Sequence, residues 1–317
     1  MQSDGLSPDI ITYNVFIDSL IKEGRMEDAS KIFDGMITLS KEPDICTYNS
    51  MILGLCSIGK LEEAHRLFDS VTDKGLKHDE YSFNLLINGY CKTSRVDDAI
   101  QLSKEMQKKG LKPDEVTYNT LIDGLCKAGK VRKAQSMLAE MQSYGVSPSI
   151  VTYNVLVNGL CKVGNIEKAR NYFFEIPNKG LVADVVTYNT MIDGLFKEGM
   201  FIEAEKLIIE MKNKGCIPNA STYDTIIRGY LLKNDVTRAL EFLKERRGRN
   251  LSLNDATKSL LAKVITLYKK MNNIGIQPCF LTLNILINCY CQLKETGHGF
   301  SLFGGLLKRG YVNILLT

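Results

Sequence analysis

The stretch VTYNTLIDGLCKAGKVRKAQSMLAEMQSYGVSPS, residues 116–149, decides the fold because closely similar stretches recur along the chain at one spacing. An aromatic residue returns every 35 residues, at Tyr13, Tyr48, Phe83, Tyr118, Tyr153, Tyr188 and Tyr223. Asn follows six of these seven aromatic residues. A fixed period of this length indicates tandem structural units, each of which buries its apolar face against its neighbours.

The pattern within residues 116–149 predicts a helical hairpin. The first helix carries apolar residues at i, i+3, i+4, i+7 and i+8, namely Tyr118, Leu121, Ile122, Leu125 and Cys126. Gly129 breaks this helix, and a second apolar stripe follows at Val131, Ala134, Met137, Leu138 and Met141. Gly145 and Pro148 then supply a left-handed cap and a stop. Because no alternating apolar and polar run competes with this pattern, we expect an all-α fold.

The period divides most of the chain into seven tandem units. They are residues 10–44, 45–79, 80–114, 115–149, 150–184, 185–219 and 220–254. Residues 1–9 match the tail of such a unit and are interpreted as the remnant of a preceding repeat, with no targeting peptide in front of it. The motif returns out of step at Asn284. We therefore expect residues 255–317 to form an irregular helical segment with a degenerate repeat at about 280–314.

Composition and cysteine spacing exclude several classes of site. Forty basic residues against 36 acidic ones give a net charge of +4, which neither requires nor excludes a polyanionic partner. Four cysteines recur at one place on the apolar helical face and are predicted to be small core residues: Cys56, Cys91, Cys126 and Cys161. No CxxC pair occurs and only three histidines are present, so no metal and no cofactor is expected. No apolar run approaches the eighteen or so residues of a membrane span.

The polar side of the first helices carries the candidate binding residues. Asn119, Asp123 and Lys127 fall at i, i+4 and i+8, away from the apolar stripe. When first helices stack side by side, these positions form rows spaced by about 8–10 Å. The first row is Asn14, Asn49, Asn84, Asn119, Asn154 and Asn189. An amide can meet the edge of a base, but an Asn near a helix start can also cap its own backbone, and the repetition does not decide between these roles.

The 35-residue period, Thr117-Tyr118-Asn119, the GLCKAGK turn at residues 124–130 and the Gly-x-x-Pro-Asp tail resemble the pentatricopeptide repeat family. The resemblance covers Ile10 to Asn254 and, less closely, Ala262 to Ile314. It implies a right-handed α-solenoid superhelix of 35-residue helix-turn-helix repeats. The uniform units are similar to the pure-repeat class, especially to plant restorer-of-fertility-like proteins.

In this family each repeat is understood to read one RNA base with its fifth and last residues. The pairs here are Asn14 with Asp44, Asn49 with Asp79, Asn84 with Asp114, Asn119 with Ser149, Asn154 with Asp184, and Asn189 with Asn219. By the family's code, Asn with Asp favours uracil, Asn with Ser cytosine, and Asn with Asn a pyrimidine. The resemblance thus implies the target 5'-UUUCU(C/U)-3'. Asp224 with Asn254, and Asn284 with Ile314, receive no base.

Two further rows accompany the pairs. The second residues of the units would flank each base by stacking, or would only close the gap between neighbouring first helices: Ile11, Cys46, Tyr81, Val116, Val151 and Val186. Lysines recur at the thirteenth position, where they could follow the phosphates or could simply be solvated near a helix C-terminus: Lys22, Lys92, Lys127, Lys162 and Lys197. Ser57 interrupts this row.

No catalytic motif is visible, and the carboxylates recur with the repeat instead of gathering at one place, so no enzyme is expected. The favoured interpretation is a monomeric protein that binds pyrimidine-rich single-stranded RNA. The resemblance places it in organellar RNA processing, stability or translation control, in mitochondria first and plastids second. The alternatives are a protein-binding solenoid and a non-functional fragment of a rearranged restorer-like gene. Protein partners would bind at the irregular C-terminal end.

Overall fold

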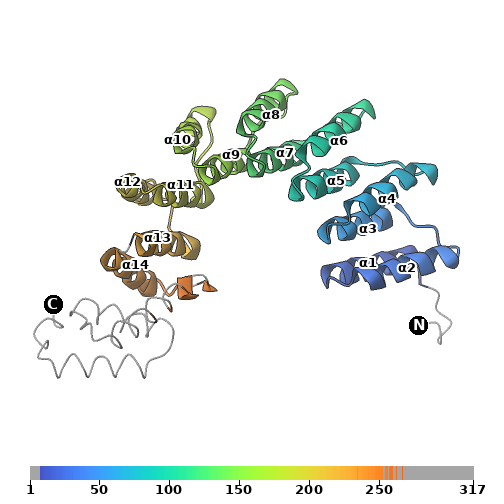
Figure 1. Cartoon of the computed structure of the whole chain (residues 1–317), viewed down its shortest axis with the longest axis horizontal. Coiled ribbons are helices and arrows are strands. Elements are labelled where there is room, and N and C mark those ends of the chain that lie inside the picture. The colour runs from blue at the N-terminus through green and yellow to red at the C-terminus, as the bar shows by residue number, and fades with distance from the viewer. Residues whose placement is uncertain are drawn as a thin grey trace, which may run out of the picture. The chain divides into compact units, whose positions relative to one another are not determined.

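The computed structural model describes residues 8–233, 235–252, 254–255, 257–259, 262 and 266. Within these residues the chain is built of helices and turns, without strands, and the helices follow one another as hairpins (Figure 1). The all-α helix-turn-helix repeat predicted from the sequence is therefore confirmed. The sequence-based predictions for residues 1–7 and for the degenerate repeat at 280–314 lie outside the described residues.

The chain divides into two compact units between Val163 and Gly164. The first unit contains α1 (Ile10–Lys22), α2 (Met26–Thr38), α3 (Ile45–Ser57), α4 (Leu61–Asp73), α5 (Glu80–Lys92), α6 (Val96–Lys108), α7 (Glu115–Lys127), α8 (Val131–Ser143) and α9 (Ile150–Lys162). The second unit contains α10 (Ile166–Glu175), η2 (Pro177–Lys179), α11 (Val185–Lys197), α12 (Phe201–Asn213), α13 (Ala220–Leu232) and α14 (Val236–Gly248). In the following, a repeat means one 35-residue period, numbered one to seven from Ile10.

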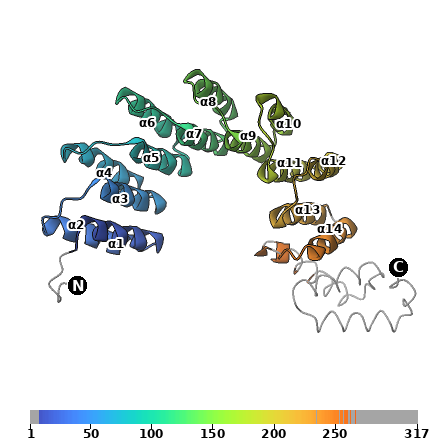
Figure 2. The same cartoon turned by 180° about the vertical axis from the view of Figure 1, so that it is seen from behind.

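Each first helix packs on the first helix of the next repeat inside a compact unit. The pairs in contact are α1 with α3, α3 with α5, α5 with α7, α7 with α9, and α11 with α13. Figures 1 and 2 show α3, α5 and α7 side by side, with α4, α6 and α8 forming a separate layer. This arrangement places corresponding residues of neighbouring first helices next to each other.

The predicted apolar stripes form the core. In α7, Tyr118, Leu121, Ile122, Leu125 and Cys126 are all at most 2% exposed, as the helical period predicts. The aromatic residues of the second, third and sixth repeats also pack edge-on against a ring of the preceding second helix. The Phe33 and Tyr48 ring centroids lie 5.6 Å apart. Each such buried large side chain contributes about 1.5–3 kcal/mol, and edge-to-face geometry adds about 0.5–1.5 kcal/mol.

The predicted core cysteines are buried, and they explain a glycine at the tenth position of the repeat. A Cβ added to Gly124 would lie 2.5 Å from Cys91 Sγ of the preceding first helix. Cys91 and Cys126 are 6% and 2% exposed, and burial raises the pKa of their thiols, to about 12 for Cys91 and about 11 for Cys126. Glycine thus permits the close approach of adjacent first helices, and cysteine fills the space that remains.

The turns follow the expected chemistry, with one local exception. Gly129 and Gly145 have φ angles of +71° and +77°, in the left-handed region that glycine tolerates. The fifth repeat differs because Pro177 lacks a backbone N–H donor and cannot continue the second helix. Consequently α10 has 10 residues, and the three-residue 3₁₀ turn η2 follows it. Among the described residues, no helix has both the length and the apolar character to cross a membrane.

Candidate nucleic-acid interface

The fifth and last residues of three repeats lie in contact in the first compact unit. Asn14 Nδ2 donates to Asp44 Oδ1 at 3.1 Å, and Asn84 Nδ2 donates to Asp114 Oδ1 at 3.4 Å. The Asn49 side chain is likewise hydrogen-bonded to Asp79. Three of the predicted base-selecting pairs are therefore brought together, although they are about thirty residues apart in sequence.

A hydroxyl group from the next first helix holds the asparagine in place in the first and third of these pairs. The Thr47 hydroxyl donates to Asn14 Oδ1 at 2.6 Å, and the Thr117 hydroxyl donates to Asn84 Oδ1 at 2.7 Å. Since these amides bond to the neighbouring repeat, the alternative that they cap their own helix is wrong for Asn14 and Asn84. One amide proton and one oxygen lone pair of each remain for an outside group.

The capping role belongs to the last residue of the pair. Asp44 Oδ1 accepts from the Thr47 backbone N–H at 2.9 Å, and Asp114 Oδ1 accepts from the Thr117 N–H at 2.9 Å, as N-caps of α3 and α7. Partial burial acts to raise the pKa of Asp114, but hydrogen bonds from Thr117 and Asn84 outweigh it and hold that pKa below its usual range. The carboxylate is thus ionised at neutral pH and fixed in orientation.

The fourth repeat has a different arrangement. Asn119 Nδ2 donates to Glu115 Oε1 at 3.3 Å, and the Ser149 hydroxyl donates to the same oxygen. Ser149 Oγ also accepts from the Val151 backbone N–H at 3.0 Å, so it caps α9. Asn119 and Ser149 are therefore bridged through Glu115, which the sequence analysis did not single out.

The remaining predicted pairs are placed differently. Asn154 lies in the first compact unit and Asp184 in the second, where Asp184 caps α11 by accepting from the Thr187 N–H at 2.8 Å. In the second unit Asn219 caps α13 by accepting from the Thr222 N–H at 3.0 Å. Asn189 Oδ1 is buried and has no hydrogen-bond partner among the described residues.

A pocket opens beside the third pair. It has a volume of about 610 Å³ and lies between α5 and α7, with Tyr81 and Val116 in its walls beside Asn84 and Asp114. Its size lies within the range of about 300–1,000 Å³ that small-molecule sites occupy. Apolar side chains from two successive repeats therefore border a space that also exposes the amide and the carboxylate.

The second residues of the repeats are exposed throughout. Ile11 is 71% exposed, Tyr81 56%, Val116 58%, Val151 53% and Val186 57%, and Cys46 is also exposed. The alternative that these residues close the gap between neighbouring first helices is wrong, because a residue that fills such a gap would be buried. Their apolar surface remains available to a flat ligand.

The lysines at the thirteenth position fall into two groups, according to whether the residue four positions earlier is an aspartate or an asparagine. Ion pairs at 2.5–2.6 Å join Lys22 to Asp18, Lys127 to Asp123 and Lys197 to Asp193. Lys92 and Lys162 follow Asn88 and Asn158 instead, and no ion pair involves either lysine in the part of the chain that the structure describes. Opposite charges at i and i+4 of a helix predict such ion pairs, and the sequence analysis did not include this prediction.

In the seventh repeat the fifth residue is withdrawn into the hairpin. Asp224 is 4% exposed, and its Oδ1 accepts from Arg246 Nη1 at 2.6 Å. Arg246, which is 1% exposed, also donates from Nε to the Leu251 carbonyl at 3.2 Å. The sequence analysis assigned no base to this repeat. In the structure its fifth residue is buried in an ion pair.

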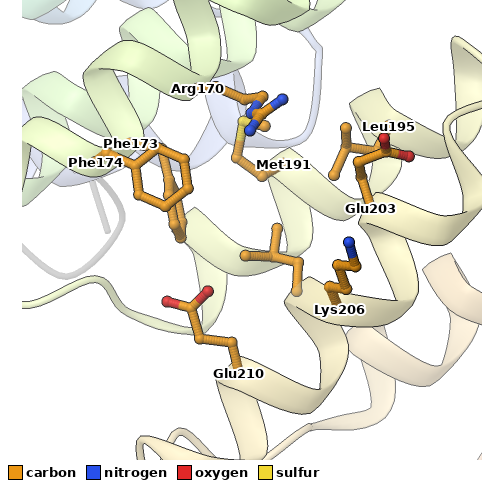
Figure 3. Close-up of a pocket in the computed structure, with 9 residues that line it drawn as sticks. Arg170, Phe173, Phe174, Met191, Leu195, Glu203, Lys206 and Glu210 are labelled. Atoms are coloured by element: carbon orange, nitrogen blue, oxygen red, sulfur yellow. The ribbon is translucent and has the colours of Figure 1, made fainter.

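The second helices offer a pocket of another kind. Figure 3 shows Arg170 and Lys206 with Glu203 and Glu210, and Phe173 and Phe174, around a space of about 310 Å³. A similar pocket of about 430 Å³ in the first unit is lined by Asp34, Glu63 and Arg66. Each of these pockets contains both acidic and basic groups, so their charges give no preference for a phosphate. Among the described residues, no group of His, Cys, Asp and Glu side chains is arranged to hold a metal ion.

Comparison with known proteins defines the class. The family model described as PPR repeat family matches residues 8–57, 43–92, 78–127, 113–162, 148–188 and 183–231, and that described as PPR repeat matches 221–247 and 281–311. The chain therefore belongs to the pentatricopeptide repeat (PPR) family.

Among solved structures, the chain is similar to the pentatricopeptide repeat protein PPR10 in complex with an 18-nt psaJ RNA element. The TM-score is 0.51 with 25% sequence identity, covering 96% of this chain and 50% of that one. A PPR10 variant with three Cys-to-Ser substitutions, in complex with the same element, gives the same values. This chain thus spans about half the length of the PPR10 chain that it matches.

Proposed function

We propose that this chain binds single-stranded RNA along its first helices, with one base for each repeat. The observation that carries the proposal is the pocket between α5 and α7, where Tyr81 and Val116 border the Asn84–Asp114 pair. A base between these two side chains would stack on apolar surface and meet a donor and an acceptor along its edge. Base stacking of this kind contributes about 1–3 kcal/mol per base.

The proposed target is 5'-UUUCU(C/U)-3', read by the family's code from the fifth and last residues of repeats one to six. The geometric support is strongest for bases one and three, since Asn14 and Asn84 are each held by an aspartate and by a hydroxyl. Lys92 and Lys162 are the lysines best suited to phosphates, because the other three lysines of the row are paired with aspartates. The similarity to PPR10 with bound RNA supports the same proposal.

The biological role that we propose is occupation of a pyrimidine-rich site on an organellar transcript, in processing, stability or translation control. A binding protein of this type acts by covering its site and requires no catalytic group. The restorer-like, pure-repeat character and the mitochondrial location, with plastids second, rest on sequence resemblance. Fractionation of tagged full-length protein between organelles tests the location.

A direct binding assay tests the RNA proposal. We expect tight binding to RNA that contains UUUCUY, where Y is a pyrimidine, and weak binding to the same RNA with each pyrimidine replaced by a purine. Asn119→Thr should weaken the preference at the fourth base alone. Equal affinity for both RNAs would remove base selection, and no RNA binding at low salt would favour a peptide ligand in the groove.

A further inference from the structure

The fourth repeat contains a third side chain within its base-selecting pair. Glu115 is the first residue of α7, and its Oε1 accepts from Asn119 Nδ2 at 3.3 Å and from the Ser149 hydroxyl. The Glu115 carboxylate therefore lies between the amide and the hydroxyl that the family's code uses for this base. It is half-buried, so it is held in place by these bonds while keeping contact with solvent.

The third repeat provides the natural comparison, because Glu80 occupies the same position there. In that repeat Asn84 donates to Asp114, and Glu80 is exposed and bonds to neither residue of the pair within the described chain. The difference follows from the last residue. Asp114 already accepts from the amide and would repel a second carboxylate, whereas Ser149 is neutral and has a hydroxyl proton to donate.

The first position of the repeat borders the space proposed for the base. Glu80 lines the pocket between α5 and α7 together with Tyr81, Asn84 and Asp114. Glu115 stands at the same place in the following repeat, on the same side of its helix. A base at the fourth repeat would therefore approach the Glu115 carboxylate as well as Asn119 and Ser149.

We propose that Glu115 is a further specificity-determining residue, which makes the fourth repeat prefer cytosine over uracil. The proposal rests on the RNA-binding function proposed above. Cytosine presents an exocyclic N4 amine, which can donate to a carboxylate oxygen, and carboxylates are the side chains that accept from this amine. Uracil presents the O4 carbonyl at the same place, and a carboxylate facing that oxygen is repelled. In repeats one to three, the amide of the fifth residue bonds to an aspartate at the last position instead of to a carboxylate at the first position.

A structural role for Glu115 would have different consequences. An acidic residue in the first turn of a helix favours the helix through the macrodipole. Glu80 and Glu115 occupy this same position in α5 and α7, so truncating either should remove the same macrodipole contribution to helix stability. Only a contribution to base selection would distinguish the two variants in RNA preference.

The experiment compares the full chain with its Glu115→Ala, Glu115→Gln and Glu80→Ala variants on RNAs that differ only at the fourth base, cytosine or uracil. We expect the unchanged chain to favour cytosine, and Glu115→Ala to reduce the cytosine-to-uracil affinity ratio about fivefold or more. Glu115→Gln, which keeps an acceptor oxygen, should retain part of the ratio. Glu80→Ala should leave it unchanged.

The outcomes separate this inference from the function on which it rests. An unaltered ratio in Glu115→Ala, with cytosine still preferred, would overturn the role of Glu115 and leave RNA reading intact. An equal change of the ratio in Glu80→Ala would also overturn it. If the unchanged chain bound pyrimidine and purine RNAs alike, the proposed function itself would fail.

Discussion

The third and seventh repeats are both helical hairpins, but their fifth residues lie in different environments. In α5 the Asn84 side chain lines a pocket and bonds to Asp114, whereas in α13 Asp224 is buried against Arg246 of α14. Arg246 takes the position that the buried Met106 occupies in α6. A buried carboxylate requires a cation, so Arg246 draws the fifth residue into the hairpin. In the seventh repeat, the second helix therefore withdraws the fifth residue from the surface.

Removing the arginine is the largest disturbance that we expect in this comparison. Arg246→Met should destabilise the α13–α14 hairpin by about 3–5 kcal/mol, because Asp224 is left buried without a counter-charge. Hydrogen exchange of the α13 amides measures the loss. The double variant Asp224→Asn with Arg246→Met restores the residue types of the third repeat and should regain most of the protection. A single variant as well protected as the double one would contradict the explanation.

The third and seventh repeats also differ in the side chain that packs against the glycine at the tenth position, which is a cysteine in one and a phenylalanine in the other. A Cβ at Gly229 would lie 2.3 Å from Phe196 Cγ, and a Cβ at Gly89 would lie 2.7 Å from Cys56 Sγ. Each substitution to Ala overpacks the contact, at a cost of about 1–3 kcal/mol. We expect the larger loss at Gly229, because a ring adjusts less readily than a thiol. Urea-induced unfolding measures both.

Gly35 in α2 provides the control for these substitutions. A Cβ there would meet nothing within 4 Å, and its φ angle is not positive. Gly35→Ala should therefore be neutral or stabilising by about 0.5–1 kcal/mol. Equal losses at all three glycines would show that close packing is not the cause.

His78, the residue before the N-cap of α5, makes the stability of the packing between α4 and α5 depend on pH. His78 is 8% exposed, stacks on Phe68 with ring centroids 3.7 Å apart, and has no hydrogen-bond partner for either ring nitrogen among the described residues. Burial lowers the pKa of His78, and Lys109 adds to this effect, while Asp69, Glu105 and Asp79 oppose it. The neutral ring is thus the form that the fold accommodates.

As pH falls through the ordinary histidine pKa of about 6.5, the unfolded chain takes up a proton more readily than the folded one, so stability declines. The decline should end below the folded pKa of His78. Pro218 occupies the corresponding place before α13, so His78→Pro should remove this slope. Unfolding free energies between pH 7.5 and 5 test the prediction, and an unchanged slope in His78→Pro would refute it.

The smallest expected effect concerns the thirteenth residue, which is Lys92 in the third repeat and Leu232 in the seventh. If Lys92 contacts a phosphate, Lys92→Ala should make the slope of log affinity against log salt shallower by about 0.7. Lys127→Ala is the matched control, and should change the slope less because Asp123 already pairs with Lys127 at 2.5 Å. RNA titrations over a series of salt concentrations measure both slopes. If both variants had the same slope, Lys92 would have no special role in phosphate contact.

Local pattern was sufficient to predict the helices and the turns between them. The stripe that includes Tyr118 and Leu125 is buried as predicted, and Gly129 and Gly145 mark the turns. The pairing of Asn84 with Asp114 followed from the family resemblance, which singles out the fifth and last residues of each repeat, and these two side chains are in contact.

The parts that were missed depend on which side chains meet across a gap in sequence. Glu115 bonds to Ser149, 34 residues later, and only because Ser149 is not an aspartate. Arg246 stands in a polar stretch of the sequence, and nothing near it identifies its partner Asp224, which lies 22 residues earlier. Pro177, by contrast, was a readable signal for the short α10.

One feature of the helix starts restricts what this architecture can evolve to recognise. The side chain at the end of each repeat also closes the first turn of the next helix, through the N-caps Asp44, Ser149 and Asn219 among others. Only short side chains with an acceptor oxygen cap a helix well, and replacing one by Ala costs about 0.5–2 kcal/mol. Under the proposed function, helix capping therefore restricts the last residue to a few residue types. A substitution there that changes the preferred base would also change the stability of the next helix.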